Sequence, residues 1–191
     1  MTGWPQQIHE LIASTFGDMD NKAYGQISTV DSHGQPSTRT VHIHCISEPQ
    51  VLVISCNTRS EKWEHIENNP LVAGCYWTDS RPIQFRFEGK AQRITEKDSR
   101  YAELVQTMWM KMREEVRITY LLDEMGMPLD IPSPNMNPTQ HSKNHGLILI
   151  QPTLWDIFEL SLKEYRLSKR TLYQLKKDTW SARSVNSLHE K

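Results

Sequence analysis

An arginine at the start of a predicted strand is the first side chain suited to holding an anion. Residues 39–44 read Arg-Thr-Val-His-Ile-His. On a strand, Arg39 and Val41 would share one face and Thr40 and His44 the other, because side chains alternate. A guanidinium binds a phosphate through two parallel hydrogen bonds. The segment is therefore either an anion site or a surface strand of mixed polarity.

A polar turn before a predicted helix is a second candidate anion site. Residues 57–62 read Asn-Thr-Arg-Ser-Glu-Lys, and Ser60 is of a type that commonly precedes a helix. Backbone N–H groups at a helix start point at a bound anion, and Lys62 would add a cation there. An ordinary helix start with a solvated lysine explains the same residues, so both interpretations stay open.

Two further segments place polar side chains on one strand face. In residues 84–89, Gln84 and Arg86 alternate with phenylalanines. An amide both donates and accepts hydrogen bonds, which suits the edge of a heteroaromatic ring. Arg166 and Arg170 lie four residues apart and would also share a strand face. They suit either an anionic group or an exposed basic rim.

Metal and nucleophilic sites have little support in the sequence. His42 and His44 would face the same side of a strand, as paired metal ligands do, but no third ligand follows at a diagnostic spacing. We therefore predict no metal. The chain also lacks the Gly-x-Ser-x-Gly motif that presents a catalytic serine.

The overall charge is near neutral but unevenly distributed. The 191 residues hold 22 Lys and Arg against 23 Asp and Glu, a net charge of −1. Eight basic and three acidic residues stand from position 163 onward, so this tail carries +5 and the remainder −6. This balance excludes a nucleic-acid binder held by overall charge. Three cysteines without a Cys-x-x-Cys pair favour a cytoplasmic protein, and no apolar run approaches the ~20 residues of a membrane span.

The pattern of apolar residues and turn signals predicts a mainly β protein with packed helices. Helices are expected at 5–16, 61–67 and, in two pieces, 96–124; strands are expected at 24–30, 35–46, 51–55, 71–77, 83–94, 146–150, 154–162 and 167–176. Residues 125–145 hold four prolines and are expected to form an irregular loop. Because strands and helices do not alternate, we predict an antiparallel barrel with helices outside, as a single domain over 1–191.

In this order, the segments resemble the pyridoxamine 5′-phosphate oxidase family, whose fold is an FMN-binding split β-barrel. The family pattern is Arg-x-Val-x-Leu-Lys, a polar turn with Ser-x-Lys, a helix running into Asn-Asn-Pro, and Gln-x-Arg/Met-x-x-Gly. Its counterparts here are residues 39–44, 55–62, 66–70 and 84–89. Four motifs in order, at family-like spacing, carry the resemblance.

The resemblance implies an FMN cofactor and a role for each matching residue. Arg39 and Lys62 would hold the FMN phosphate, with Ser60 capping the helix behind it. Contacts along the ribityl chain and the flavin ring would come from Thr40, Val41, Ser55, Cys56, Gln84, Phe158 (in place of a family tryptophan) and Arg170. His44 and Arg166 match positions that bind substrate in the family. Because two subunits of the family share each FMN, a homodimer is implied.

Departures from the family pattern bear on the substrate. His44 replaces the lysine that ends the first motif, Glu61 replaces an arginine beside the phosphate lysine, and Ser168 replaces a histidine of a late Arg-Leu-His pattern. The family's Arg-Pro-x-x-Ser substrate segment is absent. We therefore expect this protein to retain the family's FMN binding more fully than its activity on B6 vitamers.

These features predict an FMN-dependent oxidoreductase that acts on a small molecule, with a phosphorylated B6 vitamer as one candidate substrate. Two alternatives stay open. One is a non-catalytic flavin- or haem-binding protein of the same fold. The other is a binding module that uses the basic tail, although we do not expect nucleic acid as a partner.

Overall fold

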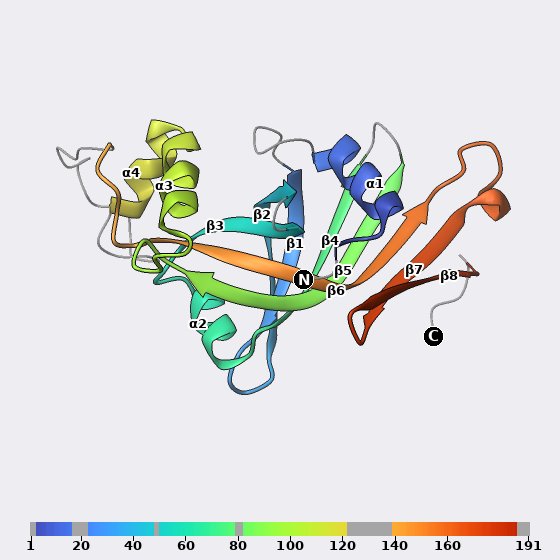
Figure 1. The fold of residues 1–191 in the computed structure, drawn as a ribbon, viewed down its shortest axis with the longest axis horizontal. Coiled ribbons are helices and arrows are strands. Elements are labelled where there is room, and N and C mark those ends of the chain that lie inside the picture. The colour runs from blue at the N-terminus through green and yellow to red at the C-terminus, as the bar shows by residue number, and fades with distance from the viewer. Residues whose placement is uncertain (1–2, 17–22, 48–49, 79–81, 122–138, 187–191) are drawn as a thin grey trace.

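An antiparallel sheet of eight strands is the main element of the fold (Figure 1). The computed structural model describes residues 3–16, 23–47, 50–78, 82–121 and 139–186. The strands are β1 (Ala23–Val30), β2 (Pro36–Ser47), β3 (Gln50–Asn57), β4 (Leu71–Thr78), β5 (Ile83–Ile94), β6 (His145–Glu159), β7 (Lys169–Lys176) and β8 (Thr179–Val185). The helices are α1 (Gln6–Phe16), α2 (Glu61–Asn68), α3 (Ala102–Lys111) and α4 (Glu114–Leu121), with a 3-10 turn η1 (Tyr165–Leu167).

The sheet closes into a barrel because β6 pairs with strands on both of its sides. Neighbours in the order β3-β2-β1-β4-β5-β6 are antiparallel, and the first half of β6 also pairs with β3, from Asn57 opposite His145 to Leu52 opposite Ile150. The second half of β6 pairs instead with β7, which carries β8 outward as a hairpin (Figure 1). One long strand thus belongs to both parts, and the predicted antiparallel split barrel is confirmed.

The barrel interior is apolar, and α2 packs into it. Phe85, Phe87 and Trp155 are buried inside the barrel. Helix α2 lies against β1 and β5, and its Trp63 and Ile66 join the same buried cluster. Because these two side chains are three residues apart, they share one helix face. The charged start of α2 is left at the rim of the barrel.

A second apolar cluster lies between helix α3 and the outer face of the barrel. Val105 and Met108 of α3 pack there against side chains of β3, β5 and β6. Trp109 is fully buried and meets Tyr120 of α4 edge-on, with ring centroids 5.9 Å apart. The two helices therefore cover the side of the barrel where β3 and β6 pair.

Two strands expected from the sequence form one continuous strand. β6 spans the predicted strands 146–150 and 154–162 and ends at Glu159. Pro152 has no N–H to donate to the ladder, and it lies opposite Gly89, where the register of the β5–β6 pair shifts. Because this bulge absorbs the proline, β6 bends without ending.

The helical region and the long loop also differ from expectation. The helices predicted for 96–124 begin only at Ala102. Of the predicted loop 125–145, residues 125–138 lie outside the described part of the chain, and His145 already belongs to β6. In the described ranges, no helix is both long enough and apolar enough to cross a membrane.

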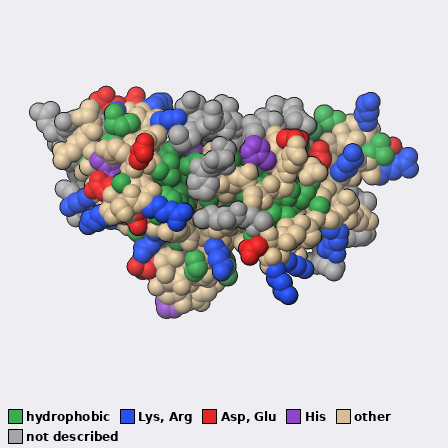
Figure 2. Space-filling view, viewed as in Figure 1, with side chains coloured by type: hydrophobic (Ala, Val, Ile, Leu, Met, Phe, Trp, Pro, Cys, Tyr) green, Lys and Arg blue, Asp and Glu red, His purple; other side chains and the backbone are tan. Residues whose placement is uncertain are grey.

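Residues 169–185 of the basic tail form a hairpin. Lys177 and Asp178 join β7 to β8, both at positive φ, and the sequence pattern did not predict β8. Figure 2 shows Lys and Arg side chains spread around this end of the molecule rather than gathered in one patch. The hairpin therefore presents scattered charges on its exposed face.

Candidate functional site

Arg39 of β2 is oriented by neighbours on β1 and β2. Its Nη1 donates to Thr29 Oγ1 at 2.7 Å and to the Ser37 carbonyl at 3.0 Å, and its Nη2 donates to Ser37 Oγ at 2.8 Å. Thr29 Oγ1 in turn lies 3.0 Å from Nδ1 of His65 in α2. The guanidinium is therefore fixed beside α2 by three hydrogen bonds.

The turn before α2 brings two more predicted contacts together. Ser60 immediately precedes α2, but its hydroxyl donates to the Asn57 carbonyl at 2.7 Å and lies 3.1 Å from Cys56 Sγ. The predicted capping role of the Ser60 side chain is therefore wrong, because its hydroxyl bonds back into the turn. The start of α2 receives no side-chain cap from this serine.

Charges converge at this turn. Burial raises the pKa of the Cys56 thiol, whereas the positive charges of Lys62 and Arg39 lower it. Burial lowers the pKa of the Arg39 guanidinium, which Glu61 opposes, and an arginine remains protonated at neutral pH. Two cations and one carboxylate thus surround the start of α2. Two cations at a helix start form a site suited to phosphate, and the carboxylate weakens it.

A groove of about 590 Å³ lies on the outer face of the sheet. Its β2 end reaches Thr38, whose side chain lies on the opposite face of the strand from that of Arg39 because side chains alternate. Its polar lining comes from β1, β2, β5, β6 and β7, and includes Gln26, Ser28, Thr38, Arg86, Asp156 and Arg170. The groove therefore offers hydrogen-bond donors and acceptors from five strands.

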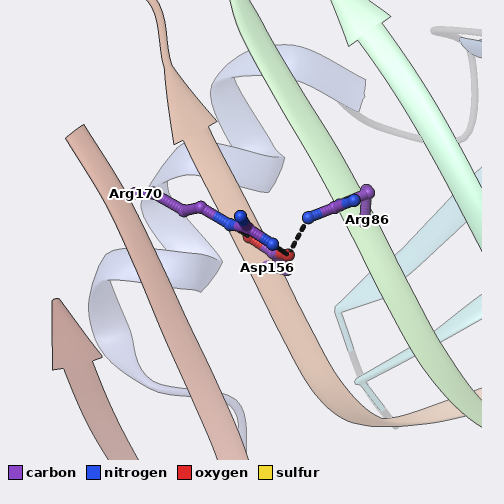
Figure 3. A network of polar contacts seen from close by, with 3 residues as sticks. All are labelled: Arg86, Asp156 and Arg170. Atoms are coloured by element: carbon purple, nitrogen blue, oxygen red, sulfur yellow. Dashed lines mark hydrogen bonds and ion pairs between the residues drawn. The ribbon is translucent and has the colours of Figure 1, made fainter. Parts of the chain in front are cut away.

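Asp156 of β6 lines the groove and lies between Arg86 and Arg170 (Figure 3). It is 5% exposed, and Arg86 Nη2 from β5 donates to its Oδ2. On the other side, Arg170 of β7 donates from Nε to Oδ1 at 3.0 Å and from Nη2 to Oδ2 at 2.8 Å. This paired geometry fixes the guanidinium plane of Arg170. The sequence analysis missed Asp156, since only strand pairing places it between two arginines.

Three predicted flavin contacts stand in one row across the sheet. Gln84 of β5 lies opposite Phe158 of β6, which lies opposite Arg170 of β7. Gln84 and Phe158 are half-buried. In Figure 1, the ends of β5, β6 and β7 that carry this row lie well to the right of α2. The structure thus groups the predicted residues into two sets, the Arg39–Lys62 cluster and the Gln84–Arg170 row, which are separated within one subunit.

The remaining predicted residues are dispersed. Thr40 is exposed, whereas the Val41 side chain is buried in the barrel core, which leaves its backbone for a ligand. His44 is buried on β2. Arg166 is exposed on η1 and pairs with Glu164, and the β6–β7 connection lies at the right-hand end of Figure 1, away from β2. One subunit therefore does not bring His44 and Arg166 together.

Ser55 of β3 faces a histidine that the sequence analysis also missed. His145, the first residue of β6, is 1% exposed, and its Nε2 lies 3.5 Å from Ser55 Oγ. Burial and, to a smaller extent, the nearby His141 together lower the pKa of His145 to about 3. His145 is therefore neutral at physiological pH.

This neutral histidine should make the protein sensitive to acid. An unfolded histidine takes up a proton below about pH 6.5, whereas His145 in the fold does so only near pH 3. The unfolded state binds more protons between these values, so the free energy of unfolding falls as the pH drops, by up to about 1.4 kcal/mol per unit. Between pH 7 and pH 5, we expect His145→Gln to lose about 2 kcal/mol less stability than the wild type.

Urea unfolding at the two pH values measures this difference. His33→Gln, which removes an exposed histidine on the β1–β2 turn, is the control and should follow the wild type. Parallel losses in the wild type and His145→Gln would contradict the account.

The described residues fit FMN at both of its ends. The Arg39–Lys62 cluster offers two cations for a phosphate, and Arg39 is already oriented by three hydrogen bonds. The half-buried amide of Gln84 and the fixed guanidinium of Arg170 offer donors and an acceptor to the edge of a flat ring.

Comparison with known proteins also indicates FMN as the ligand. A sequence model described as the pyridoxamine 5′-phosphate oxidase FMN-binding domain matches residues 1–95. Pyridoxine/pyridoxamine 5′-phosphate oxidase 2 of Arabidopsis thaliana is 22% identical over 194 residues, which cover 96% of each chain. The pyridoxine/pyridoxamine 5′-phosphate oxidase of Escherichia coli O9:H4 (strain HS) is 27% identical over 169 residues, which cover 81% of this chain and 72% of the relative.

Solved structures share the fold. A pyridoxamine 5′-phosphate oxidase-related, FMN-binding protein from Nostoc punctiforme PCC 73102 superposes with a TM-score of 0.79 at 24% identity, over 97% of this chain and 98% of the other. PhzG from Burkholderia lata 383, solved with tetrahydrophenazine-1-carboxylic acid, gives 0.68 at 14% identity, over 95% and 90%. These structures show the fold. The family model and the curated relatives, with the four motifs, show that the chain is a divergent member of the pyridoxamine 5′-phosphate oxidase family of split β-barrels and that its cofactor is FMN.

Proposed function

We propose that the protein is an FMN-dependent oxidoreductase that carries out a two-electron oxidation or reduction of a small molecule between two subunits of a homodimer. The observation that carries this proposal is the separation of the Arg39–Lys62 cluster from the Gln84–Arg170 row within one subunit. Each set of residues suits one end of FMN. A second subunit would bring the row of one chain to the phosphate cluster of the other.

The residues of this chain would bind and orient the cofactor. Arg39, Lys62 and the start of α2 would hold the phosphate. Gln84 and Arg170 would contact the ring edge, with Arg170 fixed by Asp156. FMN supplies the two-electron chemistry when bound, and the protein supplies position and electrostatics. The free cysteines Cys45, Cys56 and Cys75 support a reducing, cytoplasmic setting.

The first substrate to test is a phosphorylated B6 vitamer. Two relatives are named as pyridoxine/pyridoxamine 5′-phosphate oxidases. In a dimer, the exposed Arg166 would supply a cation for a phosphorylated substrate. His44 and Ser168 replace a lysine and a histidine of the family pattern. We therefore expect a higher KM for the phosphorylated vitamer than a protein with those two residues would have.

Anaerobic mixing of the FMN-loaded protein with pyridoxamine 5′-phosphate tests this function. We expect loss of the flavin absorption near 450 nm and its return on admission of air, with unphosphorylated pyridoxamine as the control. Light scattering on the same sample should give the mass of a dimer. Retained absorption with every B6 vitamer and with a panel of other reductants would instead indicate a flavin-binding protein without turnover.

A further inference from the structure

A chain of polar groups links the surface to Ser55. The carboxylate of Glu96, which is 48% exposed, lies 2.7 Å from Nδ1 of His141. The approach is at ion-pair distance but off the line of the ring N–H, so the contact is electrostatic. His141 Nε2 lies 2.9 Å from His145 Nδ1, and His145 Nε2 lies 3.5 Å from Ser55 Oγ. The last contact is long, as such contacts often are before a ligand binds.

The two histidine side chains lie in a largely buried enclosure of aromatic rings. The His141 side chain is 6% exposed and His145 is 1% exposed. Trp109 of α3 packs on both imidazole rings, with centroids 5.2 and 5.3 Å away, and Tyr120 of α4 meets His145 at 5.3 Å. Glu96 is the charged end of the chain at the surface, and Ser55, half-buried on β3, is its inner end.

Among the residues that the structure describes, Glu96 and Tyr120 are titratable groups that face the pair. Glu96 approaches His141 from the segment after β5, and Tyr120 faces His145 from α4. Burial and the nearby Cys56 raise the pKa of the Tyr120 phenol, so it stays protonated. Burial also keeps His145 neutral. A proton therefore enters or leaves this row of polar groups at His141 and Glu96.

Adding one proton reverses the direction of every hydrogen bond in the chain. With His141 neutral and its Nδ1–H beside Glu96, Nε2 accepts from His145 Nδ1–H, and His145 Nε2 accepts from the Ser55 hydroxyl. With His141 protonated, Nε2–H donates to His145 Nδ1, so the neutral His145 carries its proton on Nε2 and donates to Ser55 Oγ. Ser55 then changes from an acceptor to a donor toward its other side.

We propose that Glu96, His141 and His145 form a proton relay between solvent and Ser55 at the FMN site. One proton enters from water at His141 Nδ1 beside Glu96, and one passes from His141 Nε2 to His145 Nδ1. One then passes from His145 Nε2 to Ser55 Oγ, and one leaves Ser55 Oγ for a basic nitrogen or oxygen of the bound molecule; no electrons move. The destination rests on the proposed function, in which Ser55 lies beside the flavin. Two-electron chemistry on a bound molecule involves proton exchange with solvent, and this chain of polar groups would supply a route for it. His141 and His145 are positioning residues that act through Ser55.

Histidine-selective ¹⁵N NMR of the full chain tests the relay without depending on turnover. We expect His145 to stay neutral and to move its proton from Nδ1 to Nε2 as His141 becomes protonated. Spectra of His141→Gln and His145→Gln assign the signals. Glu96→Gln should shift the midpoint of the change, whereas Glu103→Gln, an exposed acid-to-amide change on α3, should not. A His145 tautomer that is constant from pH 5.5 to 8.5 overturns the relay.

FMN titrations over the same pH range test whether the relay ends at the FMN site. The FMN phosphate titrates equally in every variant, so the comparison isolates the relay. We expect the pH profile of the Kd to differ between the wild type and His141→Gln by about 3- to 10-fold across this range, as the reversal of one neutral hydrogen bond predicts. Identical pH profiles of the Kd in the wild type and His141→Gln would show that the relay does not end at the FMN site, while the proposed function stands. A protein that shows the tautomer change but binds no FMN contradicts the proposed function itself, and the relay then leads elsewhere.

Discussion

Arg39→Ala is expected to weaken FMN binding by roughly 100-fold. Hydrogen bonds to a charged group contribute about 1.5–3 kcal/mol each, and a guanidinium bound to a phosphate makes two of them. The side chain is already oriented by Thr29 and Ser37, so little ordering is needed when the ligand binds. Quenching of FMN fluorescence on titration with protein measures the Kd.

Arg93→Ala is the matched control for Arg39→Ala. Arg93 of β5 bonds to the Trp63 carbonyl at 3.3 Å and to Glu67 at 2.6 Å, so its removal also takes an arginine and its contacts from the α2 region. We expect its Kd for FMN to stay within about twofold of the wild type. Equal losses in the two variants would show that Arg39 acts on the fold rather than on the phosphate.

The same site predicts a change of opposite sign at Glu61. Glu61 acts electrostatically on Arg39 and is exposed at the first position of α2. Glu61→Gln removes a negative charge from the phosphate site, and should tighten FMN binding by about 2- to 5-fold at low salt. The gain should shrink as salt is raised, since exposed charges are screened.

Asp156→Asn is expected to lower the free energy of unfolding by about 2–3 kcal/mol. Breaking a buried ion pair costs about 3–5 kcal/mol, and solvent screening of Arg86, about one-third exposed, reduces the loss here. The amide cannot accept the paired donors of Arg170 and the donor of Arg86 together. Urea unfolding at pH 7 measures the loss.

Asp178→Asn provides the comparison for Asp156→Asn. Asp178 lies in the β7–β8 turn at a φ of 63°, a conformation that asparagine adopts readily. This variant makes the same chemical change outside the groove and should remain within about 0.5 kcal/mol of the wild type. A loss at Asp156 that is no larger would mean that the two arginines do not depend on its charge.

The barrel strands could be predicted because their hairpins carry local signals. Residues 31–34 form the expected turn before β2, and Pro70 follows α2 where the helix was expected to end. β8 has mostly exposed side chains, so its sequence lacks the alternation that identifies a half-buried strand. The expected interruption between residues 150 and 154 does not occur, because Gly89, 63 residues earlier in the chain, lies opposite Pro152 and accommodates it across the sheet.

The candidate site also contains residues with a local sequence signal and residues whose contacts depend on distant parts of the chain. Arg39, Ser60 and Lys62 stand in short motifs, so their types and spacing are enough to suggest a candidate anion site beside the alternative of an ordinary strand and helix start. Asp156 is an ordinary polar residue in the sequence, and its partner Arg86 is 70 residues away. His145 gains its role only by packing against Trp109 and Ser55, from elements distant in the chain. Contacts between distant segments have no local signal.

The absorption spectrum of the purified protein, taken before and after FMN is added and the mixture is desalted, tests the central assignment most directly. We predict flavin bands that remain with the protein, with quenched fluorescence and one FMN per subunit. The Arg39→Ala variant should emerge colourless from the same column. A wild-type protein that emerges colourless, although folded, would contradict the assignment of FMN to this site.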